Sequence, residues 1–151
     1  MADRLTHRLT WNAWLAHLDA LSRACSGASR YDAPEMVREL NALIERAPSL
    51  ACHEGLAAVD SVRLEALLDL GMADGALLAM LDKDAGFIAS RGRGDNYFVT
   101  VVLPGTGREE AAFGASLALA GVRAVILSLC APALNVADPL LALATLPAAL
   151  H

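Results

Sequence analysis

The forty residues Ala111–Leu150 read AAFGASLALAGVRAVILSLCAPALNVADPLLALATLPAAL and carry formal charges only at Arg123 and Asp138. A helix that is apolar on all sides has to be buried, because it has no polar face to offer to water. In a chain of 151 residues, complete burial of so long an apolar stretch is difficult without a second chain. The stretch therefore predicts self-association, and we expect a homodimer.

Three elements are predicted in this part of the chain. Arg108–Ala120 is expected to be a helix, and Val122–Leu129 a strand so apolar that both of its faces should be covered. Asp138–Leu150 begins with an Asp-Pro pair, which is typical of a helix N-terminus, and is expected to be a closing helix. Because Arg123 and Asp138 interrupt the apolar residues, no segment has the roughly 20 apolar residues that a membrane span needs.

The strands of the sheet are expected upstream of this stretch. Asn96–Leu103 holds a cluster of β-branched and aromatic residues that strongly favours a strand. Ala76–Leu81 and Phe87–Ala89 are short apolar runs on either side of the turn-forming residues Asp82–Gly86, which predicts a β-hairpin. A helix over Ala73–Leu81 is the alternative interpretation.

Helices are expected in the first half of the chain. Apolar residues recur at steps of three and four from Trp11 to Cys25, with Thr10 as the N-cap. A second helix is expected after Asp32 and Pro34, and a third, capped by Asp60 or Ser61, should end at Gly71. Residues 49–59 stay ambiguous.

The fold class that follows is α+β in a single domain, residues 1–151. Residues 1–60 form a helical N-terminal region and residues 61–151 a core that contains the sheet. The predicted order after the first helices is β-β-β-α-β-α, with a mainly antiparallel sheet and the helices on one side of it, as a two-layer sandwich.

Composition excludes several classes of protein. With 56% apolar and 19% charged residues the chain does not have the composition of a disordered protein. A net charge of −5 argues against a nucleic-acid partner, which would need Lys and Arg to neutralise phosphates. Three cysteines at long spacings predict neither a disulfide framework nor a zinc site, and no secretory signal is visible, so we expect a reduced, cytoplasmic protein with no metal and no cofactor.

Two glycine-rich segments are candidate ligand sites. Pro104–Gly107 is placed between a predicted strand and a predicted helix, where backbone N–H groups can hold a phosphate. It matches neither the dinucleotide fingerprint nor the P-loop, and Thr106 with Glu109 fits a helix-capping box instead. The other candidate is the loop around Arg91 and Arg93, whose two guanidinium groups suit an anion, although a solvated hairpin loop is the favoured interpretation. The candidate ligand-binding residues are Arg91, Arg93, Asn96, Thr106 and Gly107.

Other chemistry-bearing residues give weaker signals. Cys52, His53 and Glu54 are adjacent, but neighbours in sequence point away from one another in a helix or a strand, so no catalytic residue is assigned. Trp11 and Trp14 at helical spacing are typical of core anchors or interface residues. The candidate interface residues are Trp11, Trp14, Leu140, Leu141, Leu143 and Leu146.

The order of these predicted elements resembles the class I type III secretion chaperones, small acidic proteins with a helix, three strands, a helix, further strands and a closing helix. That resemblance implies a homodimer that holds an extended segment of a secreted protein on apolar surface without consuming ATP. The matching segments are Val62–Leu70, Ala76–Leu81, Phe87–Ser90, Asn96–Leu103, Arg108–Ala120, Val122–Leu129 and Asp138–Leu150.

Two functions follow as hypotheses. The first is a non-enzymatic, homodimeric module that binds a protein or peptide, chaperone-like toward a secreted or other partner, through apolar surface or an added strand. The alternative is a small-molecule-binding or sensory domain of the GAF or roadblock kind, or a small enzyme, in which Arg91 and Arg93 share one pocket with the Gly105–Gly107 turn.

Overall fold

A computed structural model describes residues 7–94 and 96–130 of the chain, and it has an α+β fold, as predicted. In this part of the chain, helices precede and follow a three-stranded antiparallel sheet, and two short 3₁₀ turns, η2 (Arg30–Asp32) and η3 (Leu50–His53), join the early helices. The main elements, in chain order, are α1 (Trp11–Ser26), α2 (Ala33–Glu45), α3 (Ser61–Asp69), α4 (Ala73–Met80), β1 (Gly86–Arg91), β2 (Tyr97–Val102), β3 (Glu109–Gly114) and α5 (Leu117–Cys130).

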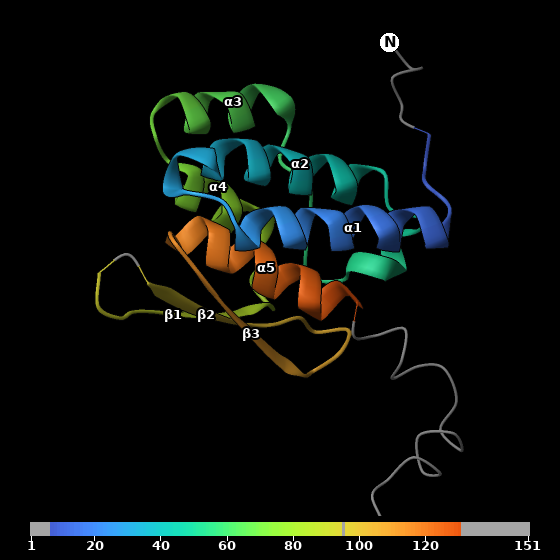
Figure 1. The fold of residues 1–151 in the computed structure, drawn as a ribbon. Helices are drawn as coiled ribbons and strands as arrows, with labels where there is room; N and C mark the ends of the chain where they lie inside the picture. Colours follow the sequence, from blue (N-terminus) through green and yellow to red (C-terminus); the bar gives the residue numbers. More distant parts are fainter. Residues whose placement is uncertain (1–6, 95, 131–151) are drawn as a thin grey trace, which may run out of the picture.

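Helix α5 lies at the centre of the molecule, between the sheet and the other helices (Figure 1). It packs on β2 and β3 with one side, and on α1, α2 and α4 with the other. Ten of its residues are buried, which is what an apolar sequence on all sides requires. Most of residues 117–130 are therefore covered by the chain itself, with Leu127 as the exposed exception, and the buried part of this helix does not need a second chain to bury it.

The sheet is a meander in the order β1-β2-β3, with antiparallel neighbours. Residues directly opposite one another point to the same face, so Phe87, Val101 and Glu110 share one face of the sheet. Val99 and Ala112, two residues away along β2 and β3, lie on this face as well. Val99, Val101 and Ala112 are buried, which identifies this inner face as the one under α5. The outer face points away from the helices.

Two predicted elements in the apolar stretch are wrong. Arg108–Ala120 is not one helix, because residues 109–114 form β3 and pair with β2 along their whole length. Val122–Leu129 is not a strand but the greater part of α5. A run buried on every side has no polar positions to reveal its period, so the sequence pattern alone does not separate helix from strand there.

The predicted hairpin of Ala76–Leu81 with Phe87–Ala89 is also wrong. Ala73–Met80 forms α4, which is the alternative interpretation, and Asp82–Gly86 leads from this helix into β1. The turn is held by the Asp84 backbone N–H, which donates to Asp82 Oδ1 over 2.8 Å. The strand expected at Asn96–Leu103 is confirmed as β2. The partner of β1, which contains Phe87–Ala89, is therefore β2 and not Ala76–Leu81.

The N-terminal helices are confirmed, and so are most of their predicted ends. The Thr10 side chain accepts from Ala13 N at the start of α1, and Asp60 accepts from Arg63 N at the start of α3. Gly71 follows α3 with a φ of +74°. Asp32 precedes α2 but does not cap it, because its carboxylate accepts from Ser29 N in the preceding 3₁₀ turn.

Asn41 holds the irregular segment between η3 and α3 onto α2. It is buried, and its amide accepts from Val59 N over 2.7 Å and donates to Val59 O over 2.9 Å. The same segment also pairs with the end of α4, since Ala57 N donates to Met80 O over 2.8 Å. These hydrogen bonds hold the backbone of residues 54–60 in place, although their sequence has the hydrophobic period of neither a helix nor a strand.

Among the described helices, none combines the length and the apolarity that crossing a bilayer would require. The predicted closing helix, Asp138–Leu150, lies outside the described residues.

Replacing Gly114 should lower stability, because α5 passes directly over this residue. A Cβ atom at Gly114 would lie 2.5 Å from the backbone nitrogen of Ala120, and backbone atoms cannot move aside as a flexible side chain can. We expect Gly114→Ala to lower the free energy of unfolding by about 1–3 kcal/mol, measured by urea denaturation.

Gly27→Ala is the matched control, because nothing lies within 4 Å of a Cβ there, and it should change the free energy of unfolding by less than about 0.5 kcal/mol. Equal values for the two variants would contradict the close contact between β3 and α5.

Candidate functional site

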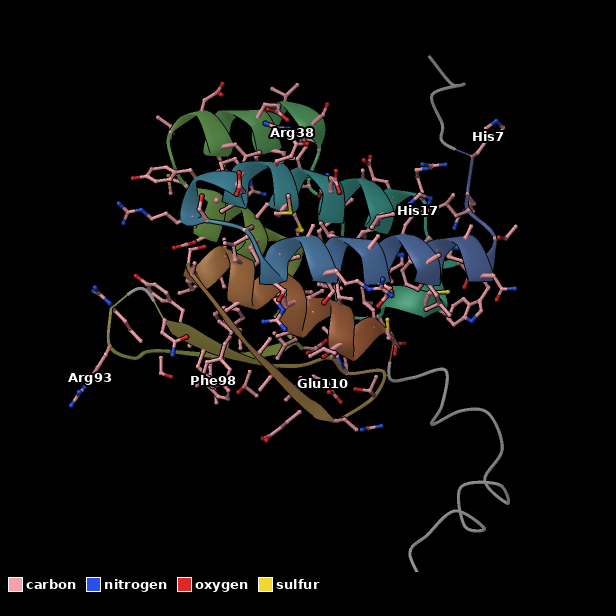
Figure 2. All side chains as sticks on the ribbon, in the orientation of Figure 1. His7, His17, Arg38, Arg93, Phe98 and Glu110 are labelled. Carbon is pink, nitrogen blue, oxygen red and sulfur yellow. The ribbon has the colours of Figure 1, made fainter. Side chains whose placement is uncertain are left out.

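The arginine loop, residues 92–96, connects β1 to β2 at one end of the sheet. Gly92 N donates to Asn96 O over 2.7 Å, and Gly94 takes a φ of +66°. Arg91 lies over the ring of Tyr97, with 5.8 Å between the guanidinium carbon and the ring centroid. Arg93 is exposed and extends away from the molecule (Figure 2). Both guanidinium groups are thus exposed, that of Arg91 at the end of β1 and that of Arg93 on the loop.

The turn from Leu103 to Arg108 connects β2 to β3 and is not followed by a helix. The N–H groups of Thr106 and Gly107 both donate to Leu103 O, over 3.1 and 3.0 Å. Thr106 Oγ1 accepts from Arg108 N over 3.0 Å. The helix N-terminus expected here is therefore absent, because residues 109–114 form β3. The capping box with Glu109 is wrong, and phosphate binding loses the helix N-terminus on which it was based.

The two candidate ligand segments lie at opposite ends of β2. Arg91, Arg93 and Asn96 adjoin its first residue, and Thr106 and Gly107 follow its last. A strand of six residues is about 20 Å long, so the two segments do not line one pocket. Figure 2 shows Arg93 at one end of the sheet and Glu110, at the start of β3, at the other. The arrangement that the small-molecule alternative requires is not present.

A cavity of about 150 Å³ lies beside the turn and is lined by Cys52, Glu54, Gly105 and Thr106, among others. It is smaller than the 300–1,000 Å³ usual for small-molecule pockets. Glu54 Oε2 lies 3.2 Å from the position of a Cβ on Gly105, so a carboxylate lines this cavity, which disfavours an anion. The Cys52 thiol is 3.3 Å from the Ser49 hydroxyl.

Cys52 and His53 face different parts of the molecule. His53 is buried, its Nδ1 lies 3.0 Å from Leu56 O, and it lines a separate hollow together with Arg8 and Ile44. A nucleophile and its base need to be within hydrogen-bond reach, and these two side chains are not so placed. Across residues 7–94 and 96–130, no group of three or more metal-binding side chains comes together.

The two tryptophans occupy different environments on α1. Trp14 is fully buried, and its indole N–H donates to Leu43 O over 2.9 Å, so it anchors α1 to α2 within the chain. Trp11 is 37% exposed, with its ring centroid 5.6 Å from that of Trp14. The other candidate interface residues lie outside the described residues: Leu140, Leu141, Leu143 and Leu146.

The outer face of the sheet is an apolar surface that the sequence analysis did not identify. Ile88 is 69% exposed and Phe113 is 53% exposed. Phe98 and Phe113 lie directly opposite each other, with ring centroids 4.7 Å apart. Val102, beyond Thr100 on the same face of β2, extends this surface toward the turn. The signal in the sequence is that β2 is apolar at both alternating sets of positions, whereas a strand with one solvated face would alternate with polar residues.

No protein family profile, no curated protein and no solved structure matches this chain. The resemblance to the class I type III secretion chaperones therefore stays a prediction, and function has to be argued from the surfaces of the chain itself.

Cys25 should be nearly unreactive in the folded protein. Burial raises the pKa of its thiol to about 12, while the charge of Arg123 lowers this pKa and the charge of Glu39 raises it. At pH 8 the thiolate population then falls about a thousandfold below that of an unfolded chain. We expect alkylation of Cys25 by iodoacetamide, followed by mass spectrometry of its peptide, to be slower by at least this factor in the native protein than in denaturant.

The same pKa shift has a consequence for stability. Because the folded pKa lies above the unfolded value, the stability linked to the neutral Cys25 thiol is complete below about pH 8.5 and is lost progressively as pH rises toward 12. Equal alkylation rates in the native and denatured protein would contradict the burial of Cys25.

Proposed function

We propose that this chain is a non-enzymatic, homodimeric protein-binding module that holds an apolar segment of a partner polypeptide on the outer face of its sheet. The observation that carries the proposal is the uncovered apolar surface formed by Ile88, Phe98, Val102 and Phe113, which we call the outer apolar face. Contiguous exposed apolar residues of this kind mark interaction sites in soluble proteins.

The size of the outer apolar face indicates what it binds. The whole outer side of the sheet, with three strands of six residues, measures about 14 by 20 Å, or roughly 300 Å², and the outer apolar face shares it with Ser90, Thr100 and Glu109. A stable interface between folded proteins needs about 800 Å² on each partner, whereas an extended segment of about six residues fits the smaller area. The expected binding is weak and reversible, which suits a chaperone-like protein that must release what it holds.

Further support comes from the order of the elements. The described elements α4-β1-β2-β3-α5 have the order helix, three strands, helix, with which the chaperone fold is expected to begin. They are not the segments matched in the sequence, because the first strand expected there, Ala76–Leu81, lies mostly in α4, and the helix expected at Arg108–Ala120 contains β3. The non-enzymatic part of the proposal is supported by the arrangement of Cys52 and His53, which line different hollows.

The proposal can be tested with reduced insulin, whose B chain aggregates and scatters light. We expect the protein to suppress this aggregation near equimolar ratio without ATP. Ile88→Ser combined with Phe113→Ser removes the two most exposed side chains of the outer apolar face, and should raise the concentration for half-suppression at least about fivefold, which corresponds to about 1 kcal/mol.

The matched control is Val62→Ser with Leu70→Ser, because these side chains are 80% and 73% exposed but lie on or next to α3, away from the sheet. It should leave suppression unchanged. The proposal fails if the wild-type protein does not suppress aggregation, or if the two double variants behave alike while both remain folded by circular dichroism.

A further inference from the structure

Strand β1 is an edge strand that no described element covers. Among residues 7–94 and 96–130 its only neighbour in the sheet is β2, and five of its six residues are exposed, the exception being the half-buried Phe87. Unpaired N–H and C=O groups along an edge strand form a template for another strand. β1 is therefore the place where a strand from another chain would add to this sheet.

The free backbone groups of β1 can be identified from the turn that follows it. Gly92 N points toward β2, because it donates to Asn96 O over 2.7 Å. Since the direction alternates along an antiparallel strand, the N–H and C=O groups of Phe87, Ala89 and Arg91 point away from β2. Across residues 7–94 and 96–130, no backbone or side-chain group hydrogen-bonds to these three residues from the open side.

Of the devices that usually protect an edge strand, β1 carries only one charged side chain, at its last residue, Arg91. Residues 86–90, GFIAS, contain no proline and no charge, and the pairing with β2 runs without a bulge from Gly86 to Arg91. An edge strand with this sequence favours pairing with a strand from another chain.

The charges at the two ends of β1 are of opposite sign. Asp82 and Asp84 precede the strand, and Arg91 and Arg93 end it, all four being exposed. With Lys83 and Asp95 included, the formal charge is −1 before the strand and +1 after it. An antiparallel neighbour with the same sequence would bring each basic end beside an acidic end, so the edge is complementary to itself.

We infer that β1 pairs antiparallel with β1 of a second copy of this chain, around a two-fold axis at Ala89, to form one six-stranded sheet. In this register Ala89 lies opposite its own copy, and Phe87 opposite Arg91, so the residues whose backbone groups point outward hydrogen-bond to one another. The inference rests on the homodimer in the proposed function and gives it an interface.

This pairing also changes the outer apolar face. A two-fold axis perpendicular to the sheet keeps the outer faces of both copies on the same side, so Ile88 of each copy lies near the junction. The outer face of the sheet then doubles in area to roughly 600 Å², enough for a partner segment of about twelve residues. Dimerisation through β1 thus enlarges the binding surface and does not cover it.

The test is a pair of charge variants whose oligomeric state is measured by sedimentation equilibrium. The acidic variant carries Arg91→Glu and Arg93→Glu. The basic variant carries Asp84→Lys and Asp82→Asn, the Asn keeping an acceptor for Asp84 N in the turn. We expect the wild type to have twice the 15.8 kDa mass of one chain at 20 µM, and each variant alone to dissociate at least tenfold more readily.

Mixing the two variants should restore a species of twice the chain mass, because acidic ends then meet basic ends. The control Arg23→Glu with Arg63→Glu makes the same change in net charge as the acidic variant, but on α1 and α3, and should remain dimeric. Circular dichroism shows whether each variant is folded.

Three results would overturn the inference. A wild type that is monomeric at 200 µM would overturn both this interface and the homodimer in the proposed function. A dimer that persists in both variants, or variants that do not associate when mixed, would overturn the β1 interface alone and leave the homodimer and the insulin experiment unaffected.

Discussion

The fold depends on the burial of α5, a helix with almost no polar surface. Because it is apolar on every side, it needs cover from two directions, and the chain provides β2 and β3 on one side and α1, α2 and α4 on the other. Two glycines make this close packing possible. Gly114 lets α5 pass directly over β3, and at Gly121 a Cβ would come within 2.2 Å of the Leu77 side chain on α4.

The same constraint determines which surfaces are left for function. The described helices all lie on one side of the sheet, so the inner face is used to cover α5 and the outer face is not covered by any described element (Figure 1). In the part of the chain that the structure describes, the sheet has three strands and leaves β1 open at its edge. Because α5 and the helices above it occupy only the inner face of a small sheet, both the outer apolar face and the edge of β1 stay open. The first is the proposed binding surface, and the second is the proposed dimer interface.

Much of the fold could be predicted where the local signal is strong. Thr10 and Asp60 cap helices as their positions suggest, and the β-branched run of β2 forms a strand. β3 could not be predicted in this way, because Glu109–Gly114 is rich in residues that favour helices and becomes a strand by pairing with β2. For the site, the sequence identified glycine-rich loops, but not the outer face, because the position of a side chain on a face follows from register.

The sequence by itself determined the fold class, the N-terminal helices, the central strand and the need to bury residues 117–130, since each depends on composition or on short-range periodicity. Only the tertiary structure decided that this apolar run is a helix, because a segment buried on all sides shows no period. It also separated Arg91 and Arg93 from Thr106, since residues near in sequence lie at opposite ends of β2 once the strand is extended. Distances between side chains depend on strand order and register, which pairing sets.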